Sequence, residues 1–239
     1  MRTWVEIDKE NLKYNVLKLK EIANNREVLG VVKANAYGLG SVEITKILQE
    51  IGVNFFGVAN LEEAIELQEA GIKDKILILG ASFEDELIEA TKRGVHVAIS
   101  SMGQLQFLVN NKLNPNMHLK FDTGMTRLGF EVDEAKKVIE FCKNNNLNLV
   151  GVFSHLSDSD GNTVETKNFT LEQIEKFKKI INSLNLKYIH ISNSAGITNF
   201  YNDIVGNLVR MGIGMYSFTG NKKHLIKKYF YNKIKTFIY

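Results

Sequence analysis

The sequence predicts an α/β fold, a (β/α)8 TIM-type barrel, from two observations. Eight short runs rich in apolar, β-branched residues are distributed along residues 28–210, as is typical of parallel strands buried on both faces. Segments with helical periodicity separate these runs. A doubly wound open sheet is the alternative arrangement of the same elements. The predicted strands are Val28–Lys33, Phe55–Ala59, Ile76–Gly80, His96–Ile99, Met117–Asp122, Leu149–His155, Tyr188–Ser192 and Leu208–Arg210.

The helices are predicted from capping residues that are followed by apolar residues at helical spacing. Asp8 is predicted to cap a helix that precedes the first strand. Asn60, Ser82 and Thr170 are predicted to cap three later helices. The polar stretch 156–168, after the sixth strand, is predicted to be an irregular loop at the catalytic rim.

The composition is that of an ordinary globular protein, with 44% hydrophobic and 24% charged residues. No apolar run approaches the roughly 20 residues that span a bilayer, and the N-terminus shows no hydrophobic signal segment. The single cysteine, Cys142, excludes an internal disulfide and is most simply a core residue, which fits a reducing compartment. We therefore predict a cytoplasmic protein.

The charge pattern divides the chain into residues 1–216, the predicted barrel domain, and residues 217–239, a basic aromatic tail. The tail holds six lysines and no acidic residue, which leaves 24 basic against 27 acidic residues in the barrel. The barrel therefore shows no electrostatic footprint for nucleic acid. The tail alone suggests an adaptor for RNA or membranes, but a solvated chain end is the favoured interpretation, because the tail lacks a clean amphipathic period.

Polar or ionisable groups stand at five of the eight predicted strand ends. In a barrel of this type, these ends meet at the rim that carries the active site. Chance would place one or two such groups there, so five indicate a site. They are Lys33, Asp122, His155, the stretch 192–194 and Arg210.

Lys33 is the strongest candidate for catalysis. A lysine that ends an apolar strand is desolvated, which lowers its pKa and frees the amine for Schiff-base or general-base chemistry. Taken alone, a snorkelling lysine at a strand end is the more common explanation. Tyr37 follows four residues later, where its hydroxyl reaches a phosphate oxygen or its ring simply packs.

An anion site is predicted at the seventh and eighth strand ends, the usual phosphate region of such barrels. Asn193 and Ser194 follow the seventh strand, and the backbone amides of Gly212 and Ile213 follow the eighth. Glycine permits a phosphate to approach the backbone closely.

Three further side chains have both a functional and a structural interpretation. His155 stacks on a flat cofactor or is a rim histidine with satisfied hydrogen bonds. Arg127 and Arg210 offer planar donors to a carboxylate or a ring nitrogen, although a structural ion pair is the more common role of each alone. The five histidines and one cysteine show no metal-ligand spacing, and neither a P-loop nor a dinucleotide fingerprint is present.

Six sequence blocks, in order along residues 1–216, resemble those of alanine racemases, the fold-type III enzymes that use pyridoxal 5'-phosphate (PLP). The block "VVKANAYG" (31–38) is similar to the PLP motif of that family. The others are "WVEIDKENLKYN" (4–15), "LKFDTGMTRLGF" (119–130), "FSHLSDSD" (153–160), "HISNSAG" (190–196) and "NLVRMGIGMY" (207–216).

The resemblance implies roles for the matching residues. Lys33 matches the lysine that forms the internal aldimine and serves as one of two proton-transfer bases. Arg127 matches the arginine that contacts the substrate carboxylate, and Lys120 matches a lysine, carbamylated in many members, that orients this arginine. Because arginine cannot be deprotonated, one facing the PLP ring nitrogen keeps that nitrogen unprotonated and weakens the electron sink. The cofactor contacts match Tyr37, Asn193, Ser194, Gly212 and Ile213 at the phosphate, His155 near the ring and Arg210 at the ring nitrogen.

The resemblance also implies an isomerase reaction, the racemisation of alanine that supplies D-alanine for peptidoglycan. The second base of the family is a tyrosine from a C-terminal β domain that reaches into the partner subunit's site, and residues 217–239 resemble no part of that domain. We therefore expect a chain cut short, with impaired or absent racemisation and doubtful dimerisation. A non-catalytic PLP-binding barrel of the homeostasis type is the alternative.

Overall fold

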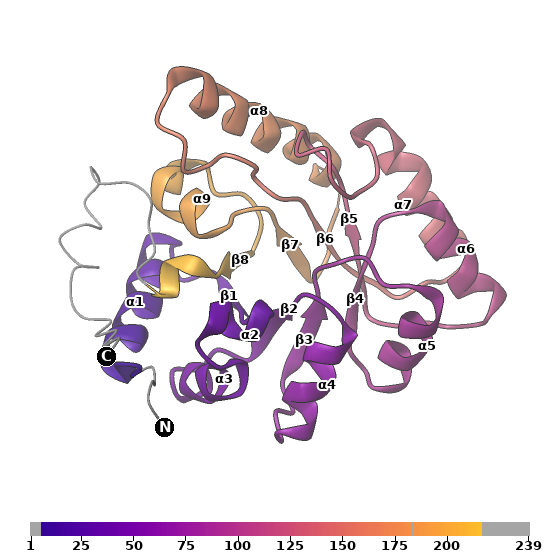
Figure 1. Ribbon diagram of the computed structural model, residues 1–239. Coiled ribbons are helices and arrows are strands. Elements are labelled where there is room, and N and C mark those ends of the chain that lie inside the picture. Colours follow the sequence, from indigo (N-terminus) through magenta and orange to yellow (C-terminus); the bar gives the residue numbers. More distant parts are fainter. Residues whose placement is uncertain (1–5, 183, 217–239) are drawn as a thin grey trace.

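The computed structural model describes residues 6–182 and 184–216, so the predicted tail (217–239) lies outside the described residues. Eight parallel strands form one sheet in the order β7-β6-β5-β4-β3-β2-β1-β8 (Figure 1). The strands are β1 (Glu27–Val31), β2 (Phe55–Val58), β3 (Lys75–Ile78), β4 (His96–Ile99), β5 (Met117–Lys120), β6 (Leu149–Phe153), β7 (Tyr188–His190) and β8 (Leu208–Met211).

Backbone hydrogen bonds between β7, β8 and the residues directly beside them close the sheet into a barrel. The N–H of Arg210 donates to the carbonyl of Ser192 at 3.0 Å, and the N–H of Asn207 donates to the carbonyl of Ile189 at 3.0 Å. The predicted (β/α)8 barrel is therefore confirmed, and the alternative of an open, doubly wound sheet is wrong.

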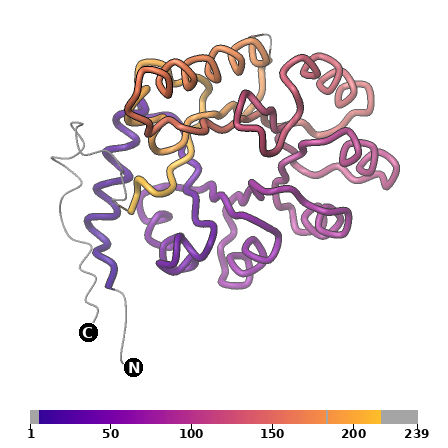
Figure 2. The backbone as a smooth tube through the Cα atoms, turned by 45° about the horizontal axis from the view of Figure 1, so that its top comes forward, coloured from indigo at the N-terminus to yellow at the C-terminus, as the bar shows by residue number. Residues whose placement is uncertain are grey.

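The helices lie around the outside of the barrel (Figure 2). The first of them precedes β1 and packs against the last turn of the described chain. None of the helices in the described ranges combines the length and apolar content needed to cross a membrane. The helices are α1 (Lys9–Ile22), α2 (Lys33–Gly38), α3 (Ser41–Glu50), α4 (Leu61–Glu69), α5 (Glu84–Lys92), α6 (Met102–Asn110), α7 (Ala135–Asn144), α8 (Val164–Ile181) and α9 (Ser194–Asn199), with 3-10 turns η1 (Val132–Glu134), η2 (Tyr201–Asp203) and η3 (Ile213–Tyr216).

Two of the predicted helix caps are confirmed and two are wrong. The side chains of Asp8 and Asn60 accept backbone N–H groups at the starts of α1 and α4. Ser82 does not cap α5, because Phe83 occupies the cap position. Thr170 lies inside α8, where its hydroxyl donates to a carbonyl one turn earlier.

The loop predicted over 156–168 is shorter in the structure, because α8 already begins at Val164. Thr163 caps this helix, and its Oγ1 accepts the N–H of Thr166 at 3.2 Å. The first turns of α8 are largely exposed, so they bury no apolar face that periodicity could reveal.

Two apolar cores support the barrel. The larger lies between the strands and the helices and includes Cys142, as predicted. The smaller lies inside the barrel. Toward the carboxyl ends, the inward-facing residues become polar, so the chemistry is concentrated at that rim. The inner core comprises Leu29, Val31, Phe55, Leu77, Tyr188 and Leu208.

Candidate active site

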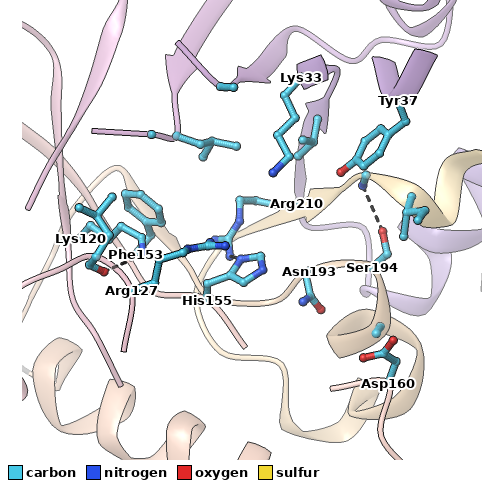
Figure 3. Close-up of a pocket in the computed structure, with 18 residues that line it drawn as sticks. Lys33, Tyr37, Lys120, Arg127, Phe153, His155, Asp160, Asn193, Ser194 and Arg210 are labelled. Atoms are coloured by element: carbon cyan, nitrogen blue, oxygen red, sulfur yellow. Dashed lines mark hydrogen bonds between the residues drawn. The ribbon is translucent and has the colours of Figure 1, made fainter. Parts of the chain in front are cut away.

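The predicted site residues line one cavity of about 580 Å³ at the carboxyl ends of the strands (Figure 3). This volume is typical of a small-molecule site. Asp122, also predicted at a strand end, instead holds the turn after β5, where its carboxylate accepts the N–H of Gly124 at 2.8 Å. The residues brought together are Lys33, Tyr37, Lys120, Arg127, His155, Asn193, Ser194, Arg210, Gly212 and Ile213.

Lys33 and Tyr37 enter the cavity from a turn of unusual backbone conformation. The four residues Ala34–Tyr37 have φ between 51° and 58°, in the left-handed helical region. Such a conformation costs an L-residue about 1–2 kcal/mol, so the turn persists only where its surroundings hold it. Figure 3 shows both side chains extending from the same side of the cavity.

The amine of Lys33 is partly buried and makes no hydrogen bond or ion pair with a described residue. Burial, and next the positive charge of Arg127, lower the pKa of Lys33, while Glu63 acts in the opposite direction. A lowered pKa increases the fraction of free amine at neutral pH, and the free amine is the nucleophile. In Figure 3 this amine points toward Arg210.

Arg210 is a buried cation, 3% exposed, and no described carboxylate forms an ion pair with it. Burial lowers the pKa of Arg210 to about 9, which leaves it protonated at neutral pH. Its Nε–H donates to no described residue, so this donor remains for a ligand. Its terminal nitrogens donate to the carbonyls of Ser154 (2.7 Å) and Ile191 (2.8 Å) and to the Nδ1 atoms of His190 (2.8 Å) and His155 (3.1 Å).

Arg210 also fixes the tautomers of a row of histidines inside the barrel. Arginine can only donate, so Nδ1 of His190 accepts and its Nε2 carries the proton. Nε2 of His190 then donates to Nδ1 of His118 at 3.2 Å, and Nε2 of His118 donates to Nδ1 of His96 at 3.1 Å. Burial is the largest cause that holds the pKa of His118 and His190 well below the usual value, so both rings are neutral.

Lys120 lies in the wall of the cavity and is 4% exposed. Its Nζ donates to the carbonyl of Leu128 at 2.9 Å and lies 5.7 Å from the centre of the Phe153 ring. Burial, then Arg210 and Arg127, lower the pKa of Lys120 to about 8. Roughly a tenth of its amine is therefore uncharged at pH 7, and the uncharged amine is the form that reacts with CO2.

The predicted anion region uses part of its hydrogen-bonding capacity within the protein. Oγ of Ser194 accepts the N–H groups of Gly212 and Gly214, both at 3.1 Å, which leaves the Ser194 hydroxyl hydrogen to donate into the cavity. The side-chain oxygen of Asn193 accepts an N–H at the start of α9. A Cβ at Gly212 would lie 2.7 Å from the Tyr37 hydroxyl oxygen, so glycine is what lets this hydroxyl approach the turn.

Two of the four predicted anion donors also make hydrogen bonds within the protein: the Gly212 N–H donates to Ser194, and the Asn193 amide donates one of its two N–H groups to the carbonyl of Leu156 at 3.1 Å. The other two predicted donors are the Ser194 hydroxyl and the N–H of Ile213, the first residue of η3, where a helix start leaves N–H groups without intrahelical acceptors. Together with Tyr37, they form a compact polar end of the cavity.

Several residues at the site were not singled out by the sequence. The ring of Phe153 stacks on that of His190 with 4.9 Å between centroids, and the guanidinium of Arg210 lies 5.6 Å from the Phe153 centroid. The missed signal is the two-residue period of a strand. It places His118 on the same face as Lys120, and His190 on the same face as Tyr188, which lies in the inner core.

The fold and the cavity define a class, a (β/α)8-barrel protein whose rim combines a partly buried lysine, a buried arginine and a polar, donor-rich end. A family profile described as "Alanine racemase, N-terminal domain" matches residues 7–219. The chain belongs to the alanine racemase family, and the match covers the whole described barrel.

Similar proteins agree with this assignment. The chain is 89% identical over 223 residues to an alanine racemase of Fusobacterium nucleatum subsp. nucleatum, which covers 93% of this chain and 63% of that one. It is 37% identical to an alanine racemase of Clostridium kluyveri, covering 90% and 57% respectively. A solved structure of alanine racemase from Clostridium difficile 630, in complex with cycloserine, matches with a TM-score of 0.86 and 30% identity over 95% of this chain and 65% of that one. The chain thus spans about three-fifths of the length of these relatives.

Proposed function

We propose that this chain provides the PLP-binding, Lys33-bearing part of an alanine racemase, which interconverts L- and D-alanine for peptidoglycan synthesis in the cytoplasm. One observation carries the proposal: the free amine of Lys33 and the unused Nε–H of Arg210 line the same cavity in a barrel of this family. The relatives are longer than this chain, so we propose the racemase activity, the alanine substrate and the dimeric partner for it on the basis of the family.

The polar groups of the cavity fit PLP. When bound, PLP supplies an aldehyde that bonds to amines and a ring that withdraws electrons from the Cα of an amino acid. Lys33 holds the aldehyde end and moves the Cα proton on its own face. Arg210 would donate through Nε to the ring nitrogen, and at neutral pH the arginine keeps its proton. The Tyr37 and Ser194 hydroxyls and the Ile213 N–H bind the phosphate.

Arg127 is proposed to bind the substrate carboxylate, since its guanidinium is a planar donor at the cavity wall. Lys120 is proposed to orient it. A carbamate on Lys120 carries a negative charge, and the positive charges of Arg127 and Arg210 both act on this side chain. His155, which accepts from Arg210 and is therefore neutral, lies near the cofactor ring.

Cofactor binding is tested with purified protein and added PLP. We expect the visible absorbance band of lysine-bound PLP, and after reduction with borohydride we expect the cofactor to be attached to Lys33. Lys33→Ala should lose both signals, whereas Lys143→Ala, an exposed lysine on α7, should retain them. A protein without the band would refute PLP binding.

A second measurement separates racemisation from non-catalytic PLP binding. In deuterated water, Cα deuterium exchange in L-alanine reports the base on the Lys33 face, whereas conversion to D-alanine also requires a base on the opposite face. Exchange that depends on Lys33 supports the catalytic role. PLP binding without exchange would favour the alternative, a PLP-binding homeostasis protein.

A further inference from the structure

The left-handed turn after Lys33 requires restraint from outside the turn. Ala34–Tyr37 are four successive residues in a conformation that L-residues rarely adopt, and none of them is glycine. The first peptide N–H of the turn, that of Ala34, finds its acceptor in a side chain and not in the backbone. This N–H belongs to the residue directly after Lys33, so whatever holds it also limits where the lysine side chain begins.

The acceptor is Glu63, whose two carboxylate oxygens bind the ends of two strands. Oε1 accepts the N–H of Ala34 at 2.8 Å, just beyond β1. Oε2 accepts the N–H of Ala59 at 2.7 Å, just beyond β2. Since β1 and β2 are adjacent parallel strands, a single side chain ties their carboxyl ends together beside the cavity.

Glu63 is itself held by the start of α4. It is the third residue of this helix, and its own N–H donates to Oδ1 of Asn60 at 3.0 Å. A glutamate at this position commonly bonds to the cap residue of its own helix. Glu63 instead reaches the residue before the cap and crosses to the neighbouring strand, an arrangement that capping alone does not require.

We propose that Glu63 is a positioning residue for Lys33, because its bidentate carboxylate fixes the left-handed turn that carries the amine into the cavity. This inference rests on the proposed function, in which Lys33 captures the cofactor. The negative charge of Glu63 also acts on the Lys33 amine. It raises the pKa of Lys33, whereas burial and the two arginines lower it.

Two variants of Glu63 separate geometry from charge. Glu63→Gln keeps the size of the side chain but replaces one accepting oxygen by an NH2 group that faces a backbone N–H. Glu63→Asp keeps the charge but is one methylene shorter, so it cannot bind both strand ends. The matched control is Glu66→Gln, one turn further along α4, where the carboxylate accepts the Ser41 hydroxyl at 3.2 Å.

Two readouts follow Lys33 without measuring turnover. The first is the rate at which the absorbance band of lysine-bound PLP appears after mixing. The second is the titration of the Lys33 amine in cofactor-free protein, obtained by competitive amine labelling and mass spectrometry. We expect both Glu63 variants to slow capture about tenfold or more, because misplacing a reacting group by about 1 Å can cost about 100-fold. We expect the Lys33 pKa to fall in Glu63→Gln only, and Glu66→Gln to match wild type in both readouts.

Capture at the wild-type rate in both Glu63 variants would overturn the proposal. So would a Glu63→Gln protein that is less stable but captures PLP and titrates at Lys33 as wild type does, because Glu63 would then only support the fold. If wild-type protein forms no PLP band, the proposed function fails by itself. In that case the amine labelling of cofactor-free protein still tests the role of Glu63, because unchanged labelling of Lys33 in Glu63→Gln rejects the positioning role.

Discussion

Among single residues, the cations that line the cavity account for both its reactivity and its choice of ligand. Lys33, Lys120, Arg127 and Arg210 all contribute to its wall. Arg127 and Arg210 lower the pKa of both lysines, in each case after burial. A cavity with this charge favours ligands that bring negative groups, and a phosphate together with an amino-acid carboxylate meets that requirement.

Lys120 provides a prediction at this scale. Because its pKa is lowered to about 8, we expect its amine to react with CO2 at neutral pH and the resulting carbamate to be stabilised by the neighbouring arginines. Protein equilibrated with 13C-bicarbonate should show a carbamate carbon signal by NMR. Lys120→Ala should remove the signal and Lys143→Ala should keep it. A signal that survives in Lys120→Ala would place the modification elsewhere.

Among the elements, strands were more predictable than helix starts. The eight strands could be located to within a few residues because a sheet buried on both faces leaves continuous apolar runs. The start of α8 could not, because its first turns are polar and exposed. The left-handed turn Ala34–Tyr37 could not either, since no glycine within it marks the positive φ values.

The features of the site also differ in how far the sequence could predict them. The strand-end residues were predictable because the barrel brings all eight carboxyl ends to one rim. The hydrogen-bond assignments were not, because they depend on distances between elements far apart in the sequence. The Gly212 amide, for example, is engaged by Ser194, which lies 18 residues earlier. In the sequence, Glu63 lies 30 positions from Lys33, and the pattern around it indicates only that a helix begins there.

Gly151 provides a prediction at the scale of the strand β6. A Cβ at this position would clash with Nδ1 of His118, so alanine would push into the histidine row. We expect Gly151→Ala to lower the free energy of unfolding by about 1–3 kcal/mol, as overpacking does in cores. Urea denaturation measures this change.

Gly103, in the first turn of α6, is the matched control for that substitution. A Cβ there meets only Oγ of Ser101, at 3.8 Å, and helices prefer alanine to glycine, by about 0.5–1 kcal/mol in their interiors and by less in the first turn. Gly103→Ala is therefore expected to raise the free energy of unfolding. Equal effects of the two substitutions would contradict the tight packing around His118.

In the whole molecule, the histidine row connects the inner core of the barrel to the cavity. His96 begins the row beside Phe55 of the inner core, at 5.2 Å between ring centroids, and Arg210 ends it at the cavity. Every hydrogen bond in the row runs in the same direction, because Arg210 can only donate. The row therefore remains intact only while its rings stay neutral.

This requirement predicts how stability depends on pH. Burial lowers the pKa of His96 to about 4 and holds those of His118, His155 and His190 well below the usual value. Between the unfolded pKa of about 6.5 and these folded values, the unfolded chain binds more protons than the folded one, so stability falls as the pH falls. Each histidine contributes up to about 1.4 kcal/mol per pH unit. Lys120 and Arg210 add almost no slope from pH 6.5 downward, because there their side chains are almost fully protonated in both states.

We therefore expect the free energy of unfolding, measured by urea denaturation, to decrease steadily from pH 6.5 to pH 5, above the range where carboxylates begin to be protonated. His118→Gln offers a donor and an acceptor at the same place without titrating, so its slope should be smaller by up to about 1.4 kcal/mol per pH unit. The slope is the informative quantity, because the substitution also changes packing and shifts the stability at every pH. A variant with the wild-type slope, or a protein that gains stability on acidification over this range, would show that the row does not titrate as a buried neutral unit.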